Sequence, residues 1–344
     1  MFGKIVFWII FTLSLIIVTA GMAYLYWRIF RADQRIAAAI LILLLFIIGY
    51  QAYDNNRITV AEDIVYIPDL PSAFEDFTIL QITDLHGKRF GQNQVNLISQ
   101  INALEYDMIA VTGDMETGTK SFEPFIEMLE GLKNKESVFY INGNLDLAYD
   151  SLTGQKTEVG TLLERYGCIL LTEPHPIEKE GTTLWLADVT TRPYRGYEVY
   201  SGIPPREFRT DEQYQIYQSR FTEFLSIYAP STNDVDVKVA FAHIPFTKSD
   251  LEKGVPTHNN LDFDLVIAGH YHGGQVRVPF YGAPFIPVMT SSFYDGFFPD
   301  QNYVSGLAAG NSIQQYISRG LGASNIPFRL FNTPEINLLT LKAM

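Results

Sequence analysis

The sequence contains a single cysteine, Cys168, among 344 residues, so it can form no disulfide within the chain and no cysteine-based zinc site. Charged residues make up 18%, and acidic side chains outnumber basic ones, which gives a net charge of −13. No nucleic acid is expected as a partner, because phosphate backbones are bound by basic surfaces. There is no internal repeat or low-complexity tract, and 47% hydrophobic residues exclude a disordered chain.

Two long apolar runs lie near the N-terminus. Ile5–Trp27 and Ile36–Tyr53 contain about 23 and about 18 residues, enough to span a bilayer at ~1.5 Å per residue. We interpret residues 1–53 as a membrane anchor of two antiparallel transmembrane helices. One alternative is a signal peptide, which normally has a shorter apolar core of about 7–15 residues. Another is a single span followed by a buried or interfacial helix.

The arginines between the two runs predict the orientation of the anchor. Arg28, Arg31 and Arg35 outnumber the basic residues at the outer ends of the runs, and the cytoplasmic side of a membrane collects positive charge. We therefore expect a two-pass protein of the cell membrane with its catalytic domain outside the cytoplasm. Residues 1–60 carry a net +3 from five basic and two acidic side chains, which leaves −16 for the rest.

The remainder divides into residues 54–76, a tether with a first edge element, and residues 77–344, a single domain. Short apolar runs alternate there with amphipathic segments, which indicates a layered α/β fold. The predicted strands are Phe77–Thr83, Met108–Thr112, Val138–Asn142, Ile169–Leu171, Thr183–Ala187, Val237–Ala242 and Leu265–Ala268. The predicted helices are Gln92–Leu104, Phe122–Leu132 and Thr157–Tyr166.

Potential metal ligands follow directly after five of these strands, where open α/β sheets bind their ligands. Residues i and i+2 of an extended segment point to one side, so Asp84 and His86 can share an ion. Oxygen and nitrogen donors without thiolate suit Mn, Fe or Zn. Seven ligands exceed the needs of one ion, whereas two ions about 3.5–4 Å apart that share a carboxylate would use them all. The seven are Asp84, His86, Asp114, Asn144, His243, His270 and His272, whereas His175 and His258 fall in polar loops.

The ordered series Asp84-x-His86, Gly113-Asp114, Gly143-Asn144-x-Asp146, His243 and Gly269-His270-x-His272 resembles the calcineurin-like metallophosphoesterases, over the chain from Phe77 onward. Residues 269–275 and 318–322 resemble the membrane-anchored or exported bacterial branch of that family. The resemblance implies a layered sandwich of two central mixed β-sheets flanked by helices. It also implies that Asp84, His86 and His272 hold one metal ion and that Asn144, His243 and His270 hold a second. Asp114 would bridge the two.

One position departs from the family motif. Leu145 stands where the family has a histidine that protonates the leaving oxygen or stabilises charge in the transition state. Leucine cannot donate a proton, and loss of a general acid costs ~10²–10⁴ in rate. Asp146, which orients that histidine in the family, lacks its usual partner.

These residues predict hydrolysis of a phosphodiester, pyrophosphate or phosphomonoester, lipid-linked substrates included, by a hydroxide held between two divalent ions. Asp114, Asp146 and Arg89 are the predicted catalytic residues. The alternative is a membrane-anchored pseudoenzyme that binds metal and phosphate without turnover, because of Leu145. A protein that uses the fold only as a spacer would bind no metal.

Two further segments have two interpretations each. Within Thr190–Phe208, the side chains of Arg192, Tyr194 and Arg195 either bind the substrate or belong to a surface loop paired with the acidic domain. Lys88 and Arg89 present the same choice. The aromatic stretch Phe280–Phe298 either packs into the core or contacts an apolar substrate or membrane lipid.

Overall fold

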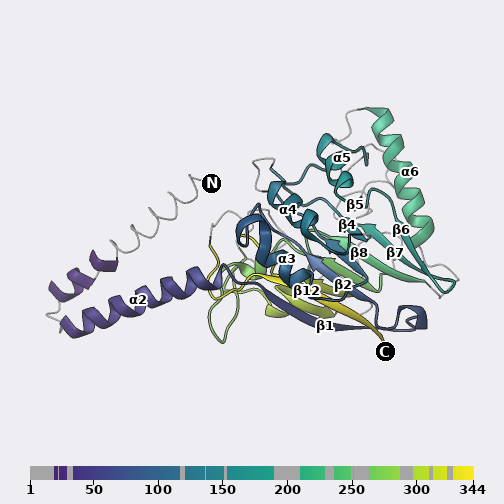
Figure 1. Ribbon diagram of the computed structural model, residues 1–344. Coiled ribbons are helices and arrows are strands. Elements are labelled where there is room, and N and C mark those ends of the chain that lie inside the picture. The colour runs from purple at the N-terminus through teal and green to yellow at the C-terminus, as the bar shows by residue number, and fades with distance from the viewer. Residues whose placement is uncertain are drawn as a thin grey trace. The chain divides into compact units, whose positions relative to one another are not determined.

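The computed structural model of the protein (Figure 1) describes residues 19–21, 23–28, 34–116, 121–135, 137–150, 153–189, 210–228, 236–248, 251, 263–286, 297–309, 313–323 and 328–344. The chain divides into two compact units, Met1–Asp54 and Asn55–Met344.

The N-terminal unit contains helix α2, Gln34–Asp54, which matches the second predicted span. Among the described residues, α2 is the one helix long and apolar enough to cross a membrane. Its apolar side chains, such as Ile42, Leu43 and Phe46, are exposed, so it is no core helix of this unit. Most of the first predicted span lies outside the described residues, although 19–21 and 23–28 are helical.

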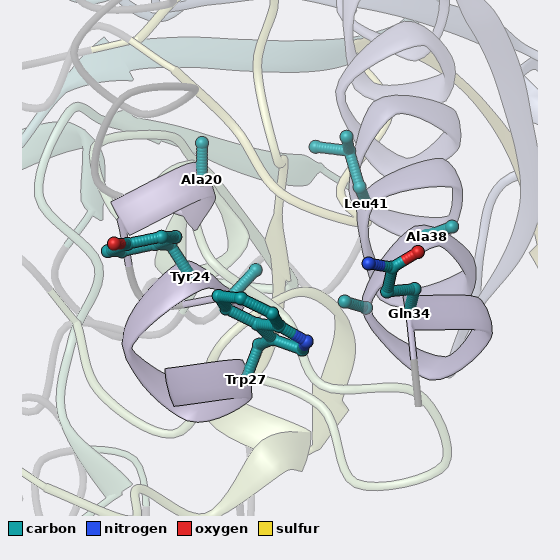
Figure 2. A pocket seen from close by; sticks show the side chains of 8 residues that line it. Ala20, Tyr24, Trp27, Gln34, Ala38 and Leu41 are labelled. Carbon is teal, nitrogen blue, oxygen red and sulfur yellow. The ribbon is translucent and has the colours of Figure 1, made fainter. Parts of the chain in front are cut away.

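An apolar groove of about 330 Å³ lies between the two helical segments of this unit. Figure 2 shows Tyr24 and Trp27 on one side and Gln34, Ala38 and Leu41 of α2 on the other. The rings of Tyr24 and Trp27 lie 5.9 Å apart. The groove is a local feature of the N-terminal unit and contains none of the predicted site residues.

The second unit is built on two six-stranded mixed sheets, as the family resemblance implied (Figure 1). The first has the order β1-β12-β2-β3-β4-β5, and the second has the order β10-β11-β9-β8-β7-β6. Strands β2 to β5 run parallel to one another, as do β7, β8, β9 and β11. The strands of the first sheet are β1 (Thr59–Ile67), β2 (Thr78–Ile82), β3 (Met108–Val111), β4 (Val138–Tyr140), β5 (Cys168–Leu170) and β12 (Glu335–Ala343). Those of the second are β6 (His175–Lys179), β7 (Thr182–Asp188), β8 (Val237–Ala242), β9 (Leu265–Ala268), β10 (Gly306–Ala309) and β11 (Gln314–Ile317).

The two sheets pack against each other through one apolar cluster. Ile79 of β2, Phe139 of β4 and Phe241 of β8 are among its fully or almost fully buried side chains. Leu80, the neighbour of Ile79 on β2, belongs instead to a second cluster on the outer face of the first sheet. Both faces of β2 are therefore buried, which explains its continuous apolar sequence.

Helices cover the outer face of the first sheet. They are α3 (Val95–Ile101), α4 (Glu123–Gly131) and α5 (Glu158–Arg165). A further helix, α6 (Asp211–Tyr228), lies between β7 and β8 in the sequence. Helix α5 begins where predicted, because the Thr157 hydroxyl caps it by accepting a hydrogen bond from the Gly160 amide at 3.2 Å. Single turns of 3₁₀ helix occupy Ser72–Phe74, Gln92–Gln94, His272–Gly274 and Gln301–Tyr303.

The first predicted helix, Gln92–Leu104, is shorter in the structure, where α3 spans Val95–Ile101. The Gln94 side chain accepts a hydrogen bond from the Phe90 amide and donates to the carbonyl oxygens of Lys88 and Pro124. These bonds hold the backbone at Gln94 in a left-handed conformation, with φ of 60°, so regular helix starts only at Val95.

Candidate metal centre

The predicted ligands meet at one edge of the two sheets, because parallel strands place their carboxyl ends together. Asp84 and His86 follow β2, Asp114 follows β3 and Asn144 follows β4. The remaining three come from the second sheet, with His243 after β8 and His270 and His272 after β9. Apart from Asn144, all of these side chains are buried.

The first group consists of Asp84, His86 and His272. The His272 Nε2 atom lies 3.1 Å from Nε2 of His86 and 3.5 Å from Oδ1 of Asp84. The distance from His86 Nε2 to Asp84 Oδ1 is 3.9 Å. Ligand atoms at about 2.0–2.2 Å from one ion lie roughly 3.0–3.5 Å from one another. The three side chains are therefore spaced closely enough to surround a single ion.

The second group consists of Asp114, His243 and His270, joined by Asn144. The His243 Nε2 atom lies 3.0 Å from Nδ1 of His270, 3.0 Å from Oδ1 of Asn144 and 3.4 Å from Oδ2 of Asp114. That Asp114 oxygen is also 3.6 Å from His86 Nε2 of the first group. Asp114 thus lies between the groups, where a bridging carboxylate is needed.

The donor set fits divalent ions on a further observation. Oδ1 of Asp84 and Nδ1 of His272 are buried and make no hydrogen bond. A buried polar atom without a partner is costly, and a bound cation at Asp84 would satisfy that oxygen. Imidazole and carboxylate without thiolate suit Mn, Fe or Zn.

The electrostatics of the cluster also favour added positive charge. Burial raises the pKa of the Asp84 carboxyl to about 7, against the opposing effect of His243. Burial acts to raise the pKa of Asp114 as well, but the charge of His243 outweighs it and lowers that pKa below its usual range. Burial lowers the pKa of His270 to about 3, and that of His272 falls well below its usual range for the same reason. His270 and His272 are therefore neutral, as metal ions require, whereas at His243 the effect of burial is outweighed by Asp114 and Asp84, which raise the pKa of that ring to about 10, so a metal ion would displace a proton from it.

Backbone geometry at the ligands differs from the extended segment expected. Asp84 and His86 have φ of 53° and 47°, so they converge through a left-handed turn after β2 and not through strand alternation. Asp114, His270 and His272 also have positive φ, between 49° and 71°. Such conformations cost about 1–3 kcal/mol each in non-glycine residues and cluster at functional sites.

Two glycines allow the turns to approach the ligands. A Cβ atom on Gly143 would collide with Oδ1 and the backbone nitrogen of Asp114. A Cβ atom on Gly269 would collide with Oγ1 of Thr83 and lie 2.5 Å from Oδ2 of Asp84. Their positions in the motifs are therefore steric requirements of the ligand cluster.

The two residues after Asn144 have separate roles. The Leu145 side chain is 37% exposed, and its amide donates a 3.0 Å hydrogen bond to Oδ1 of Asp114. Asp146 is buried, and its carboxylate accepts hydrogen bonds from the amides of Met115, Glu116 and Gly143 at 3.1–3.3 Å. Burial, with the charge of Asp114, raises the pKa of Asp146 to about 6. Asp146 thus ties together the turns after β3 and β4.

The remaining predicted site residues lie elsewhere or outside the described residues. Arg89 forms 2.8 Å ion pairs with Glu123 and Glu127 of α4. Arg192, Tyr194 and Arg195 fall on residues that the structure does not describe. Lys88 donates hydrogen bonds to the carbonyl oxygens of Asn55 and Leu321. His175, expected outside the site, lies on β6 beside Phe139.

Sequence reasoning missed two polar residues that support the first group. Arg329 is completely buried and donates to the carbonyl oxygens of Gly320, Gly322 and Asn332. Asn332 in turn donates a 2.7 Å hydrogen bond to the carbonyl oxygen of His272. The nearest signal in the sequence is the run 318–322, which belongs to the family resemblance.

Comparison with known proteins agrees with this site. A family model described as "Calcineurin-like phosphoesterase" matches residues 77–274. The uncharacterized metallophosphoesterase YkuE of Bacillus subtilis (strain 168) is 25% identical over 303 residues, 86% of this chain and 90% of that protein. The phosphodiesterase YaeI of Escherichia coli (strain K12) is 29% identical over 278 residues, 77% of this chain and 82% of that protein.

Among solved structures, the purple acid phosphatase PPD1 from yellow lupin (Lupinus luteus) seeds superposes with a TM-score of 0.36 and 12% identity. The match covers 80% of this chain and 55% of the phosphatase chain.

Proposed function

The chain belongs to the calcineurin-like phosphoesterase family and is a metal-dependent phosphoester hydrolase, and we propose that it acts on membrane-borne phosphodiesters or pyrophosphates. The observation that supports a two-ion site is the position of Asp114. Its Oδ2 atom lies 3.6 Å from Nε2 of His86 and 3.4 Å from Nε2 of His243, between the two ligand groups. We propose Mn, Fe or Zn as the two ions.

When bound, such ions polarise the phosphoryl group and supply a nucleophilic water at neutral pH. Asp84, His86 and His272 would hold one ion, and Asn144, His243 and His270 the other. Asp114 would contribute to both, held in place by the amide of Leu145.

The leaving group restricts the choice of substrate. Leu145 has no proton to donate, and Asp146 is committed to three backbone amides. Protonation of the leaving oxygen would therefore depend on a water or on another side chain. A good leaving group needs the least help, which favours pyrophosphates and aryl-like diesters over alkyl phosphomonoesters.

The competing function is a pseudoenzyme that binds metal and phosphate without turnover, and Leu145 is the observation in its favour. The test uses the purified full-length protein loaded with Mn and assayed with bis-p-nitrophenyl phosphate. Asp114→Ala is expected to lower the rate by at least about 100-fold, since loss even of an outer-sphere partner costs 10–100-fold. Asp211→Ala, at the exposed start of α6, is the matched control and should retain full activity.

Each outcome of that assay decides between the candidates. Metal-dependent release of nitrophenol that disappears in Asp114→Ala supports the hydrolase. Two bound ions with no release on diester or pyrophosphate substrates support the pseudoenzyme. If no metal is bound after reconstitution with Mn, Fe and Zn, both the hydrolase and the metal-binding pseudoenzyme are excluded.

We also propose that residues 1–53 anchor the protein as two transmembrane helices, with the catalytic unit outside the cytoplasm. The exposed apolar surface of α2 supports the anchor, and Arg28, Arg31 and Arg35 support the orientation. Protease added to intact spheroplasts is expected to digest the catalytic unit without lysis. Protection until detergent is added would reverse the orientation and direct the search to cytoplasmic lipid-linked substrates.

A further inference from the structure

Four aromatic side chains of the catalytic unit are exposed close together. Phe280, Tyr281, Phe297 and Phe298 have exposed fractions of 111%, 47%, 76% and 71%. The rings of Tyr281 and Phe298 lie 6.3 Å apart, so residues distant in sequence form one surface. This finding contradicts the interpretation that these four side chains pack into the core. We call the four residues the aromatic surface.

The backbone holds the aromatic surface in a defined conformation. The amide of Gly282 donates to the carbonyl oxygen of Val278 at 2.9 Å, which closes a tight turn with Phe280 at its tip. The amide of Phe298 donates to the carbonyl oxygen of Pro284 at 2.8 Å. Phe280 and Phe298 have φ of 66° and 60°, conformations that are unfavourable for bulky residues. Residues held in such strained conformations by backbone hydrogen bonds cluster at functional sites.

The aromatic surface is connected to the point where the chain leaves the anchor. Asn55, the first residue after α2, exchanges hydrogen bonds with the backbone of Arg329. The next residue, Leu330, pairs with Gln275 and Arg277 at the base of the aromatic turn. Two such pairings span about 10 Å, and the three residues from Arg277 to Phe280 add at most about 10 Å. With about 4 Å more for the step from Arg329 to Leu330, Phe280 lies within roughly 24 Å of Asn55.

The charge near the anchor exit differs from that of the unit as a whole. Arg57 donates to Thr333, Lys88 donates to the carbonyl oxygen of Asn55, and Arg277 donates to Gly273. Three basic side chains thus lie near Asn55, where the chain leaves α2, although the catalytic unit as a whole is strongly acidic. Basic residues beside aromatic ones complement anionic headgroups and the membrane interface.

The same turn lies against the first metal group. A Cβ atom on Gly274, two residues after His272, would collide with the Cβ atom of Ala283 and lie 3.0 Å from the carbonyl oxygen of Phe285. The segment that presents the aromatic surface therefore packs directly on the turn that holds His272.

We propose that Phe280, Tyr281, Phe297 and Phe298 insert into the headgroup region of the bilayer that holds α2, and so present lipid-linked phosphoesters to the metal centre. The proposal rests on the membrane anchoring proposed above. Its occupant is lipid, because Asn55 follows α2 directly in the chain and the basic side chains near Asn55 suit anionic headgroups.

The test measures membrane insertion in the full-length protein, reconstituted into vesicles of phosphatidylcholine and phosphatidylglycerol. Nitroxide labels are attached to Phe280→Cys or Phe298→Cys in a Cys168→Ala background. Leu162→Cys is the matched control, because Leu162 is an exposed apolar residue on α5, beside the sheet edge opposite β1. The ratio of collisions with oxygen to collisions with a water-soluble nickel complex should be at least threefold higher at positions 280 and 298 than at 162.

The outcomes separate this inference from the anchoring. Equal ratios at all positions, in protein that stays with the vesicles after a carbonate wash, would overturn the inference and leave the anchor intact. A label shielded from both reagents would mean that another protein surface covers the patch, which also overturns it. Release of the protein by carbonate would overturn the anchoring itself.

A second measurement tests the link to the substrate. The double variant Phe280→Ser/Phe298→Ser should keep its rate on soluble bis-p-nitrophenyl phosphate and lose at least fivefold on a lipid-linked nitrophenyl diester in the same vesicles. Equal rates of variant and parent on the vesicle substrate would refute the presentation of lipid.

Discussion

Removal of the Arg329 guanidinium is expected to destabilise the catalytic unit and weaken its first metal group. The side chain is fully buried. Its Nε donates to the Asn332 carbonyl oxygen at 2.8 Å, and its Nη1 donates to the carbonyl oxygens of Gly320 and Gly322 at 3.1 and 2.8 Å. The bonds thus join residues 320–322 to residue 332, the two segments that border the turn of Asp84 and the His272 carbonyl.

The magnitude follows from those bonds. Hydrogen bonds to a charged group contribute about 1.5–3 kcal/mol each, and acceptors left buried without a donor lose that amount. Arg329→Met keeps much of the volume, and the carbonyl groups can relax, so we expect about 3–5 kcal/mol, less than the full sum for three such bonds. At about 2–4 °C per kcal/mol, the melting temperature should fall by roughly 6–20 °C. Arg329→Lys should recover part of this loss, because lysine supplies the charge without the planar fork.

The assay is thermal unfolding of the full-length protein in detergent, combined with metal analysis. Arg165→Met, on an exposed part of α5, is the control and should melt like the parent. The amide of Gly322 donates to the carbonyl oxygen of Asp84 at 2.6 Å, so the variant should lose metal from the first group before the second. A melting temperature within 2 °C of the parent, or two ions still bound with unchanged affinity, would refute this reasoning.

Three further predictions concern single positions. Leu145→His should raise turnover on poor leaving groups more than on activated ones, and an equal effect on both would count against its assignment. Gly269→Ala should lower both metal content and melting temperature, because the added methyl group meets Thr83 and Asp84; a fully loaded, stable variant would contradict that geometry. Burial raises the pKa of the Cys168 thiol to about 12, so at pH 8 iodoacetamide should alkylate it roughly 1,000-fold more slowly than a free thiol, as followed by mass spectrometry. Alkylation at the rate of a free thiol would show that the side chain is accessible.

The strands that carry the ligands could be predicted because their signal is local. Continuous apolar runs end in polar residues at β2, β3, β8 and β9, and the structure places their bounds within one or two residues of those predicted. The pairing of β1 with β12 had no such signal. Residues 59–67 run parallel to residues 335–343, a contact decided by tertiary packing across the whole unit. In Figure 1 the two strands lie side by side although they come from opposite ends of the colour scale.

The sequence does not predict the position of charged side chains that are buried or of apolar side chains that are exposed. Arginine is rarely buried completely, so nothing in the sequence marked Arg329 as part of the core. The reverse holds for Phe280 and Phe298. Their apolar side chains predict a position in the core, but both are exposed. Carbonyl oxygens of neighbouring turns accept the guanidinium hydrogen bonds of Arg329, and backbone hydrogen bonds hold the turns of Phe280 and Phe298. Neither arrangement has a signature in the sequence.

A contact made by the backbone, and not by the side chain, explains how the candidate metal site tolerates Leu145. The contact from position 145 to Asp114 is made by a backbone amide, which donates to Oδ1 of Asp114 whatever side chain is attached. Asp146 joins the turns of Asp114 and Asn144 through three further amides. Exchange of a histidine for leucine therefore removes a proton donor without moving a ligand. Asp146 joins the backbone turns that carry Asp114 and Asn144, which gives this carboxylate a structural role apart from any partner histidine.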